Sequence, residues 1–283
     1  MAMKLIKKAI LLGLVGFTAL TQTSNAQVLD PSDDGIIPEP TKHFHNTRVI
    51  PYPFLRQDDM LWSTRHWERI DVREKINMPL YYPIQEVPDR KSLYATMIDG
   101  ITSEGTISEV FDDDRFEIPL TPEEVEQRIF KVDTTLDPDD PSVILLIDTI
   151  KVQSVDIVAW DIKSDWYFDK QRGEMKNRII GISPRVRDPQ NKSEIYNLFW
   201  VWFPDSRYAL ATSVAYNVNN NNQRLTYDQI LHLRMFKAVV YKEDNVYDRA
   251  IKDYKRKSAM DQLLEAQYLR EKLRNKEHDM WEF

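Results

Sequence analysis

Residues 61–83 read LWSTRHWERIDVREKINMPLYYP, and the fold assigned to the chain depends most on how this stretch is interpreted. It holds two tryptophans, two tyrosines and a dense mix of charged residues, without a pattern of catalytic groups or metal ligands. Tryptophan, tyrosine and arginine dominate the hot spots of protein interfaces, but large aromatic residues also fill cores. Two alternatives therefore stay open for Trp62 and Trp67: they pack inside the domain, or they contact another protein.

Local signals predict a helix over residues 61–70. Asp58 or Asp59 supplies the capping residue in front of it, as helix starts require. Trp62 and Trp67 are five positions apart, so they do not share one helical stripe. The two indoles therefore do not stack on one face of the predicted helix.

Two further helices are predicted in the first half of the chain. One follows Asp89, has apolar residues at helical spacing and stops near Gly105, which fits the usual stop signal. Thr121 begins a capping box with proline at the first helical position, and this pattern predicts a short helix over residues 122–130.

The middle of the chain has the pattern of a sheet. Four segments there are rich in β-branched and aromatic residues, as is typical of buried strands: residues 143–147, 155–162, 178–183 and 198–203. Residues 169–176, which contain Gly173, are the predicted turn between two antiparallel strands. Strands in the middle and helices towards both ends predict an α+β fold, with a central, mainly antiparallel sheet flanked by helices.

The C-terminal third is predicted to be helical. A capping box begins at Thr226, and apolar residues continue at helical spacing to Ala238. Residues 245–278 are highly charged and helical in composition, and they predict a long C-terminal helix. At 100° per residue its apolar residues point in two directions, with Met260, Leu263, Leu264 and Tyr268 on one side and Leu269 and Leu273 nearly opposite. Such a helix is either kinked or contacts two different partners, one on each side.

Residues 1–26 have the features of a secretory signal peptide. Lys4, Lys7 and Lys8 precede an apolar run of about a dozen residues, and small residues lead up to Ala26. A membrane span needs roughly 20 apolar residues, and no cysteine follows the run to carry a lipid. We therefore expect cleavage after Ala26 and an exported protein that is not inserted in a membrane.

Residues 27–57 are expected to form an extended, proline-rich arm, and residues 58–283 a single α+β domain. Prolines at positions 31, 38, 40, 51 and 53 disfavour helix in the arm. Two alternatives stay open for the arm. It is a disordered tether, or it wraps a neighbour by burying the apolar pairs 36–37 and 49–50.

Composition excludes several classes of function. The chain has no cysteine, hence no disulfide, thiolate metal site or cysteine nucleophile. Three of its 38 Lys and Arg residues belong to the predicted leader, so 35 basic residues face 45 acidic ones afterwards. That balance argues against nucleic acid or anionic lipid as the main partner. Only seven glycines occur, and none is clustered as phosphate-binding loops require.

No segment has a specific catalytic or metal-binding pattern. The histidines of residues 43–45 lack a third ligand nearby, and the acidic runs 112–114 and 137–140 lack the spacing of a calcium loop. We expect both acidic runs to be solvated turns. Asp165 and Asp169 flank three aromatic residues, but residues four apart on a strand are roughly 13 Å apart, too far for a glycosidase acid pair. We therefore expect no catalytic residue, no cofactor and no metal.

Six segments read together resemble the GldN/PorN family, the gliding-motility and type IX secretion proteins of Bacteroidetes. They are WSTRHWERIDVREKINMPLYYP (62–83), SDWYFDKQRGEMKNRIIGISP (164–184), LFWVWFPDSRYALA (198–211), TYDQILHLRMF (226–236), NVYDRAIKDY (245–254) and EHDMWEF (277–283). The segments span nearly all of residues 58–283 in the family's order. The last contains the family's His-Asp-x-Trp-x-Phe pattern.

The resemblance implies a non-catalytic structural subunit of the type IX secretion and gliding machinery. Proteins of this family are periplasmic and not lipidated, and they bind an outer-membrane lipoprotein (GldK/PorK), with which they build a large ring. Contact with the periplasmic region of the motor subunit (GldM/PorM) is also implied. We therefore expect a periplasmic protein that self-associates within a ring, is held at the inner face of the outer membrane through the lipoprotein, and binds no nucleic acid.

The candidate residues for partner contact are Arg65, Trp67, Arg73 and Trp281. The segments that contain them have no catalytic or metal-binding pattern, and exposed tryptophan and arginine residues anchor many interfaces. The alternative for the tryptophans is that they pack in the core. The competing function is an exported carbohydrate-binding or hydrolytic protein that stacks sugars on the aromatic residues of its strands. These residues are Trp160, Trp166, Trp200 and Trp202.

Overall fold

The computed structural model describes residues 49–281 of the 283-residue chain, except 86, 88, 89, 137–143, 190, 192 and 218–224. At residues 132–136, 144–148 and 281 it describes the backbone alone. The predicted signal peptide (1–26), most of the predicted arm (27–48) and the acidic run 137–140 therefore lie outside the described residues. None of the described helices combines the length and apolar character of a membrane span.

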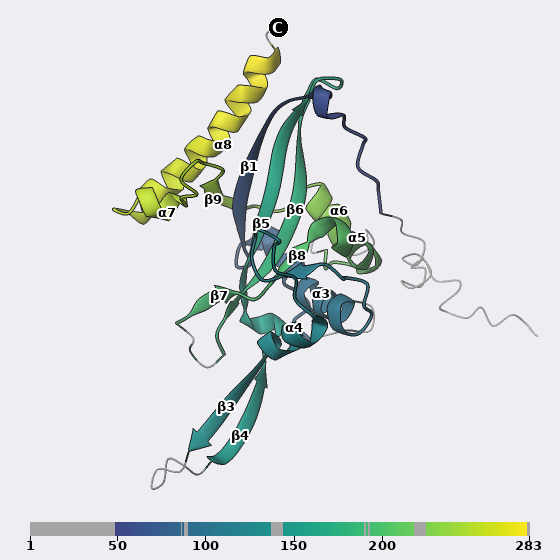
Figure 1. Cartoon of the computed structure of the whole chain (residues 1–283), viewed down its shortest axis with the longest axis vertical. Helices are drawn as coiled ribbons and strands as arrows, with labels where there is room; N and C mark the ends of the chain where they lie inside the picture. Colours follow the sequence, from purple (N-terminus) through teal and green to yellow (C-terminus); the bar gives the residue numbers. More distant parts are fainter. Residues whose placement is uncertain are drawn as a thin grey trace, which may run out of the picture. The chain divides into compact units, whose positions relative to one another are not determined.

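The described chain contains both helices and strands (Figure 1). In order, with η for a 3-10 helix, they are η1 (Gln57–Asp59), β1 (Met60–Asp71), η2 (Lys75–Leu80), α3 (Leu93–Thr102), β2 (Val110–Phe111), α4 (Pro122–Ile129), β3 (Phe130–Leu136), β4 (Ile144–Lys151), η3 (Ser154–Asp156), β5 (Ile157–Asp169), β6 (Glu174–Arg187), β7 (Ile195–Asn197), β8 (Trp200–Trp202), α5 (Phe203–Thr212), α6 (Tyr227–His232), β9 (Val239–Glu243), α7 (Ile251–Tyr254) and α8 (Ala259–Trp281).

The centre of the fold is an antiparallel sheet (Figure 1). Within the described residues it has seven strands in the order β2-β8-β6-β5-β1-β9, with β7 as a further neighbour of β6. Each paired strand runs antiparallel to its neighbour, and β3 and β4 pair with each other in a separate two-stranded sheet. The predicted α+β fold with a central antiparallel sheet, flanking helices and a long C-terminal helix is confirmed.

The main core lies between the central sheet and the helices α3 to α6. α5 contacts β6 and β8 of the sheet as well as α3 and α6. Fully buried side chains come from both layers, with Ile70 of β1 and Trp160 of β5 in one cluster with Phe203 of α5 and Tyr227 of α6. Burying a large apolar side chain contributes about 1.5–3 kcal/mol, so this cluster supplies much of the stability.

The two predicted capping boxes and the predicted turn are confirmed. Thr121 and Thr226 each form the two reciprocal hydrogen bonds of a capping box, at α4 and α6. α3 begins one residue after Ser92, whose hydroxyl accepts a hydrogen bond from the amide of Ala95. The hairpin between β5 and β6 turns at Gly173, whose φ of +64° is a left-handed value that favours glycine.

The helix predicted over residues 61–70 is wrong, because the segment forms the strand β1. β1 lies inside the sheet and pairs with both β5 and β9. Strand formation depends on such partners more than on local propensity, and these partners are far away along the chain. Asp58 and Asp59 belong to η1, a single short turn before the strand.

Three other predicted elements differ in extent. The helix predicted over residues 245–278 is divided into the short α7 and the long α8, which begins only at Ala259. The strand predicted over residues 198–203 is only β8, because Phe203 begins α5 with Pro204 in its first turn, where a missing N–H costs nothing. The helix predicted from Thr226 towards Ala238 ends at His232, and Arg234 takes a left-handed φ of 53°. The chain therefore leaves the helix before Met235.

Candidate protein-interaction surfaces

β1 places Arg65, Trp67 and Arg69 on one face of the sheet, since alternate residues of a strand share a face. The register sets each of them opposite a charged residue of β5. Arg65 donates to both carboxylate oxygens of Asp165, from Nε at 2.6 Å and from Nη2 at 2.8 Å. Arg69 binds Asp161 in the same way, at 2.7 and 3.0 Å. Arg65 is thus partly exposed but already uses one side of its guanidinium within the sheet.

Trp67 lies in the interior of the domain, with 6% of its surface exposed. Its indole N–H donates to Oδ2 of Asp114 at 2.8 Å. The ammonium groups of Lys163 and Lys242 lie 5.4 and 4.2 Å from the ring centroid, within cation–π range. Burial lowers the pKa of Lys163. Trp67 therefore packs as a core residue between two lysines, whereas Trp62 is half-buried.

The acidic run 112–114 forms a partly exposed turn, and two of its carboxylates also bind other side chains of the domain. Asp112 pairs with Arg128 at 2.6 Å, and Asp114 holds the indole of Trp67. A polar cleft of about 350 Å³ lies beside them. Within the residues that the structure describes, no group of three or more His, Asp or Glu is arranged to hold a metal ion.

Arg73 lies on the surface after β1, with 76% of its side chain exposed. It pairs with Asp71 at 2.6 Å, and that hydrogen-bonded pairing lowers the pKa of the Asp71 carboxyl. A cavity of about 670 Å³ adjoins it, lined among others by Val72, Tyr81 and Tyr82. Of the predicted contact residues, Arg73 is the one most accessible to a partner among those whose side chains are described.

Trp281 is the last residue of α8, where the structure describes its backbone alone. The structure therefore places the four predicted contact residues in different surroundings. Arg65 is half-exposed on the sheet, Trp67 is buried, Arg73 is exposed beside a cavity, and Trp281 is at a helix end. Their contact with a partner stays a prediction.

α8 is one continuous helix that rests on β9 (Figure 1). Ala266 and Leu269 are buried there against Val240 and Ile251. Because the exposed apolar residues of α8 lie on its other side, this contact accounts for the buried half of the predicted two-sided pattern.

Polar contacts add to the attachment of α8. Arg270 donates to the carbonyl of Ala238. Lys272 binds Glu243 at 3.0 Å, and Nε2 of His66 lies 3.6 Å from the same carboxylate. The nearby His66 and the hydrogen-bonded Lys272 lower the pKa of Glu243. Together with the apolar contact, these bonds fix one side of α8 to the sheet.

The opposite side of α8 is exposed. Its apolar residues are between 54% and 62% exposed, and they are Met260, Leu263, Leu264 and Tyr268. The two-sided pattern predicted from sequence is therefore real: one side meets β9, and the other faces away from the sheet. We call this exposed set the α8 stripe.

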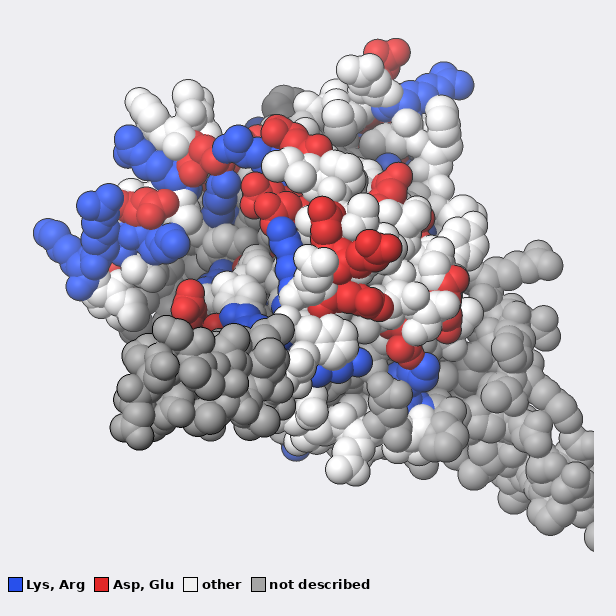
Figure 2. Space-filling view, turned by 60° about the horizontal axis from the view of Figure 1, so that its bottom comes forward, with Lys and Arg blue, Asp and Glu red and all other residues white. Residues whose placement is uncertain are grey.

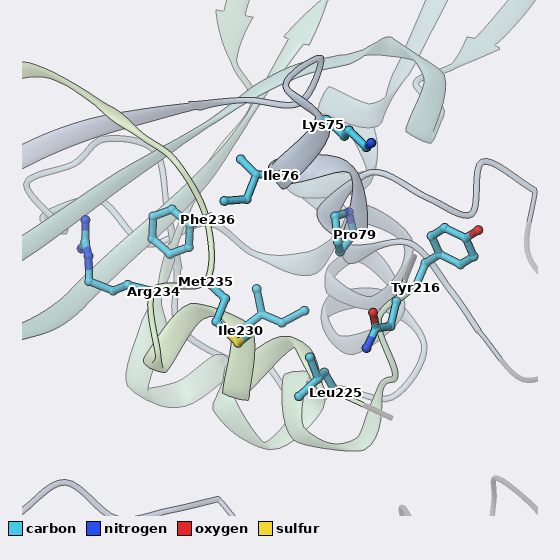
Figure 3. Close-up of a pocket in the computed structure, with 10 residues that line it drawn as sticks. Lys75, Ile76, Pro79, Tyr216, Leu225, Ile230, Arg234, Met235 and Phe236 are labelled. Carbon is cyan, nitrogen blue, oxygen red and sulfur yellow. The ribbon is translucent and has the colours of Figure 1, made fainter. Parts of the chain in front are cut away.

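A groove of about 630 Å³ lies between η2 and the end of α6 (Figure 3). Ile76 and Met235 in its wall are about half exposed, and Arg234 is held in place by Glu68 and by Asn177, the latter at 2.9 Å. No pattern in the sequence indicates this groove, which we call the η2–α6 groove. Its apolar lining comes from Ile76, Pro79, Tyr216, Leu225, Ile230, Met235 and Phe236, and its polar lining from Lys75, Asn217 and Arg234.

Acidic side chains gather on one face of the domain. Figure 2 shows them gathered across the middle of that view, with Lys and Arg mainly at one edge. Lysine or arginine on a partner would complement such a face, whereas like charges disfavour association. Exposed acidic residues between the end of α3 and the end of α4 include Glu104, Glu109, Asp113, Glu117, Glu123 and Glu126.

The tryptophans of the competing carbohydrate-binding hypothesis do not form an exposed strip. Trp160 and Trp200 are buried, and Trp166 and Trp202 are half-buried. The guanidinium of Arg234 lies 5.0 Å from the ring centroid of Trp166. Stacking a sugar requires an open ring face, and the two buried rings have none.

Comparison with known families matches residues 55–282 to one family, described as "Gliding motility associated protein GldN". The matched range includes β1, both sheets, α8 and all four predicted contact residues. Comparison with curated proteins gives no match.

Proposed function

Because this chain belongs to the GldN family, we propose that it is a non-catalytic structural subunit that binds an outer-membrane lipoprotein of the GldK/PorK type and builds a periplasmic ring with it. Membership makes the chain a component of the gliding-motility and type IX secretion machinery. The single observation that carries the proposal is the family match, which spans nearly the whole described domain.

The surfaces of the domain support a role in assembly. The domain has an exposed apolar helix face, an apolar groove and a cavity beside Arg73, and the three are lined by different residues. Exposed apolar patches of this kind mark interaction sites in soluble proteins. A ring subunit needs several such surfaces at once, since it meets neighbours and other components simultaneously.

The proposal includes location and further partners. The chain is exported, stays in the periplasm without inserting in a membrane, and is held at the inner face of the outer membrane through the lipoprotein. It also contacts the periplasmic region of a motor subunit of the GldM/PorM type. Co-purification of the chain with the lipoprotein from detergent extracts tests this role, and a chain that never co-purifies would count against it.

At the level of residues, we propose that Arg65, Arg73 and Trp281 contact the lipoprotein. Trp67 is buried, so its part is to hold β1 and Arg65 in place from inside. Arginine and tryptophan are the residue types that most often dominate an interface energetically.

Replacing Arg73 by alanine should weaken capture of the lipoprotein by at least about tenfold, as loss of an interface arginine commonly does. The midpoint of urea unfolding should not change, because Arg73 is exposed and pairs with its near neighbour Asp71. Biolayer interferometry on the immobilised lipoprotein measures the affinity. Arg115→Ala is the matched control, since Arg115 is also exposed and its ion pair with Asp248 is long. Equal affinities for R73A and the wild type would remove Arg73 from the interface.

A further inference from the structure

The α8 stripe has the form of a docking helix. Met260, Leu263, Leu264 and Tyr268 follow one another at spacings of three, one and four residues, which places them on a single helical face. Each is more than half exposed. The buried side of the same helix is already occupied by β9, so the stripe has no role in holding α8 to its own domain.

The η2–α6 groove has the complementary form. In Figure 3 the side chains of Ile76 and Pro79 face those of Ile230 and Met235 across it. Its volume of about 630 Å³ lies in the range of pockets that accept a buried ligand or a few side chains. Apolar grooves of this kind bind amphipathic helices through anchors at helical spacing.

The two surfaces share no residue and belong to different elements of the domain. α8 packs on β9 (Figure 1), whereas the groove is lined by η2 and by residues in and around α6. Ala266, Leu269 and Arg270 fix α8 to β9 and its flank, so a chain cannot place its own stripe in its own groove. A contact between unlike surfaces joins copies head to tail and repeats.

Charged residues at the edges of the two surfaces favour contact between the α8 stripe and the η2–α6 groove. Lys75 lines the groove, is exposed and forms no ion pair among the described residues. Asp261, beside Met260 on α8, is also exposed and without an ion pair in the described part of the chain. Opposite charges at the rim of an apolar contact set its register and exclude wrong partners.

From these observations we propose that the α8 stripe of one copy docks in the η2–α6 groove of the next copy. The occupant of the groove is thus a second copy of this chain. The inference rests on the proposed role as a repeated ring subunit, and it names the surfaces through which neighbouring copies meet.

The test uses the purified chain, with sedimentation velocity at rising concentration. Leu263→Glu/Leu264→Glu changes the stripe, and Met235→Glu changes the groove. Each should raise the dissociation constant of self-association at least about thirtyfold, as loss of a hot spot does. Val246→Glu is the matched control, because Val246 is 99% exposed and belongs to neither surface. Far-UV circular dichroism and urea unfolding confirm that the variants are folded.

Mixing the two variants gives the sharpest outcome. L263E/L264E keeps the groove intact, and M235E keeps the stripe intact. An equal mixture should therefore form dimers but no larger oligomers, while each variant alone stays monomeric. The charge exchange Lys75→Glu with Asp261→Lys should weaken association singly and restore it in combination. A wild-type chain that stays monomeric, or a mixture that does not dimerise, would overturn the proposal.

Parallel binding assays identify other occupants of the two surfaces. Binding of the wild type, but not of L263E/L264E, to phosphatidylethanolamine–phosphatidylglycerol vesicles without self-association would assign the stripe to a membrane surface and overturn the proposal. Loss of lipoprotein capture by L263E/L264E, where the wild type is itself monomeric, would assign the stripe to the lipoprotein and would overturn it as well.

The same assays separate this inference from the proposed function. Monomeric variants that still capture the lipoprotein support both statements. Self-association of the wild type through these surfaces without any lipoprotein capture supports this inference and contradicts the proposed function.

Discussion

Trp67→Ala should lower the free energy of unfolding by about 3–5 kcal/mol, the usual cost of truncating a large buried aromatic residue. Trp67 is 6% exposed, donates to Asp114 at 2.8 Å and packs between two lysines. Removing the ring leaves a cavity in the sheet and a carboxylate without its donor. Urea unfolding followed by far-UV circular dichroism measures the change.

Trp67→Phe is the matched control for this variant. It keeps most of the packing and loses the hydrogen bond to Asp114, which should cost about 1 kcal/mol. If W67A kept its unfolding midpoint but no longer captured the lipoprotein, the prediction would be wrong. The indole would then contact the partner and not the core.

Asp228→Ala should lower the free energy of unfolding by about 3–5 kcal/mol, because it leaves a buried cation without its partner. Arg207 of α5 and Asp228 of α6 are 4% and 3% exposed. They are joined by two hydrogen bonds of 2.7 and 3.0 Å. The ring of Tyr52, from the segment before β1, lies 4.5 Å from the Arg207 guanidinium and covers the pair. Urea unfolding again measures the change.

The double variant Arg207→Met/Asp228→Leu separates the attraction between the two charges from the cost of removing them from water. Replacing both charges by apolar groups of similar size removes the buried cation and should be milder than D228A. Glu174→Ala, which breaks an exposed pair with Lys176, should change stability by less than about 1 kcal/mol. A D228A variant as stable as E174A would show that the ion pair is not buried in solution.

The elements that sequence predicts well are those fixed by neighbouring residues. Capping boxes at Thr121 and Thr226 depend on residues three positions away, and the β5–β6 turn depends on Gly173. β1 depends instead on residues such as Asp165, far along the chain, and its local pattern predicts a helix. Short-range signals therefore found the helix starts and the hairpin but not the central strand.

The same distinction applies to the surfaces. The stripe on α8 is visible in sequence because all its residues lie on one helix. The η2–α6 groove joins Ile76 to Met235, which only the tertiary fold brings together. The burial of Trp67 likewise depends on Asp114 and Lys163 from other parts of the chain. The sequence therefore indicates candidate contact residues, but it does not show which of them are buried and which are exposed.

The central claim, that the chain is a structural subunit of a ring, is tested most directly by reconstitution with the lipoprotein and negative-stain electron microscopy. We expect closed rings of uniform diameter when both proteins are present, and their loss when L263E/L264E replaces the wild-type chain. A wild-type chain that remains a monomer beside the lipoprotein, with no rings on the grid, would contradict the claim.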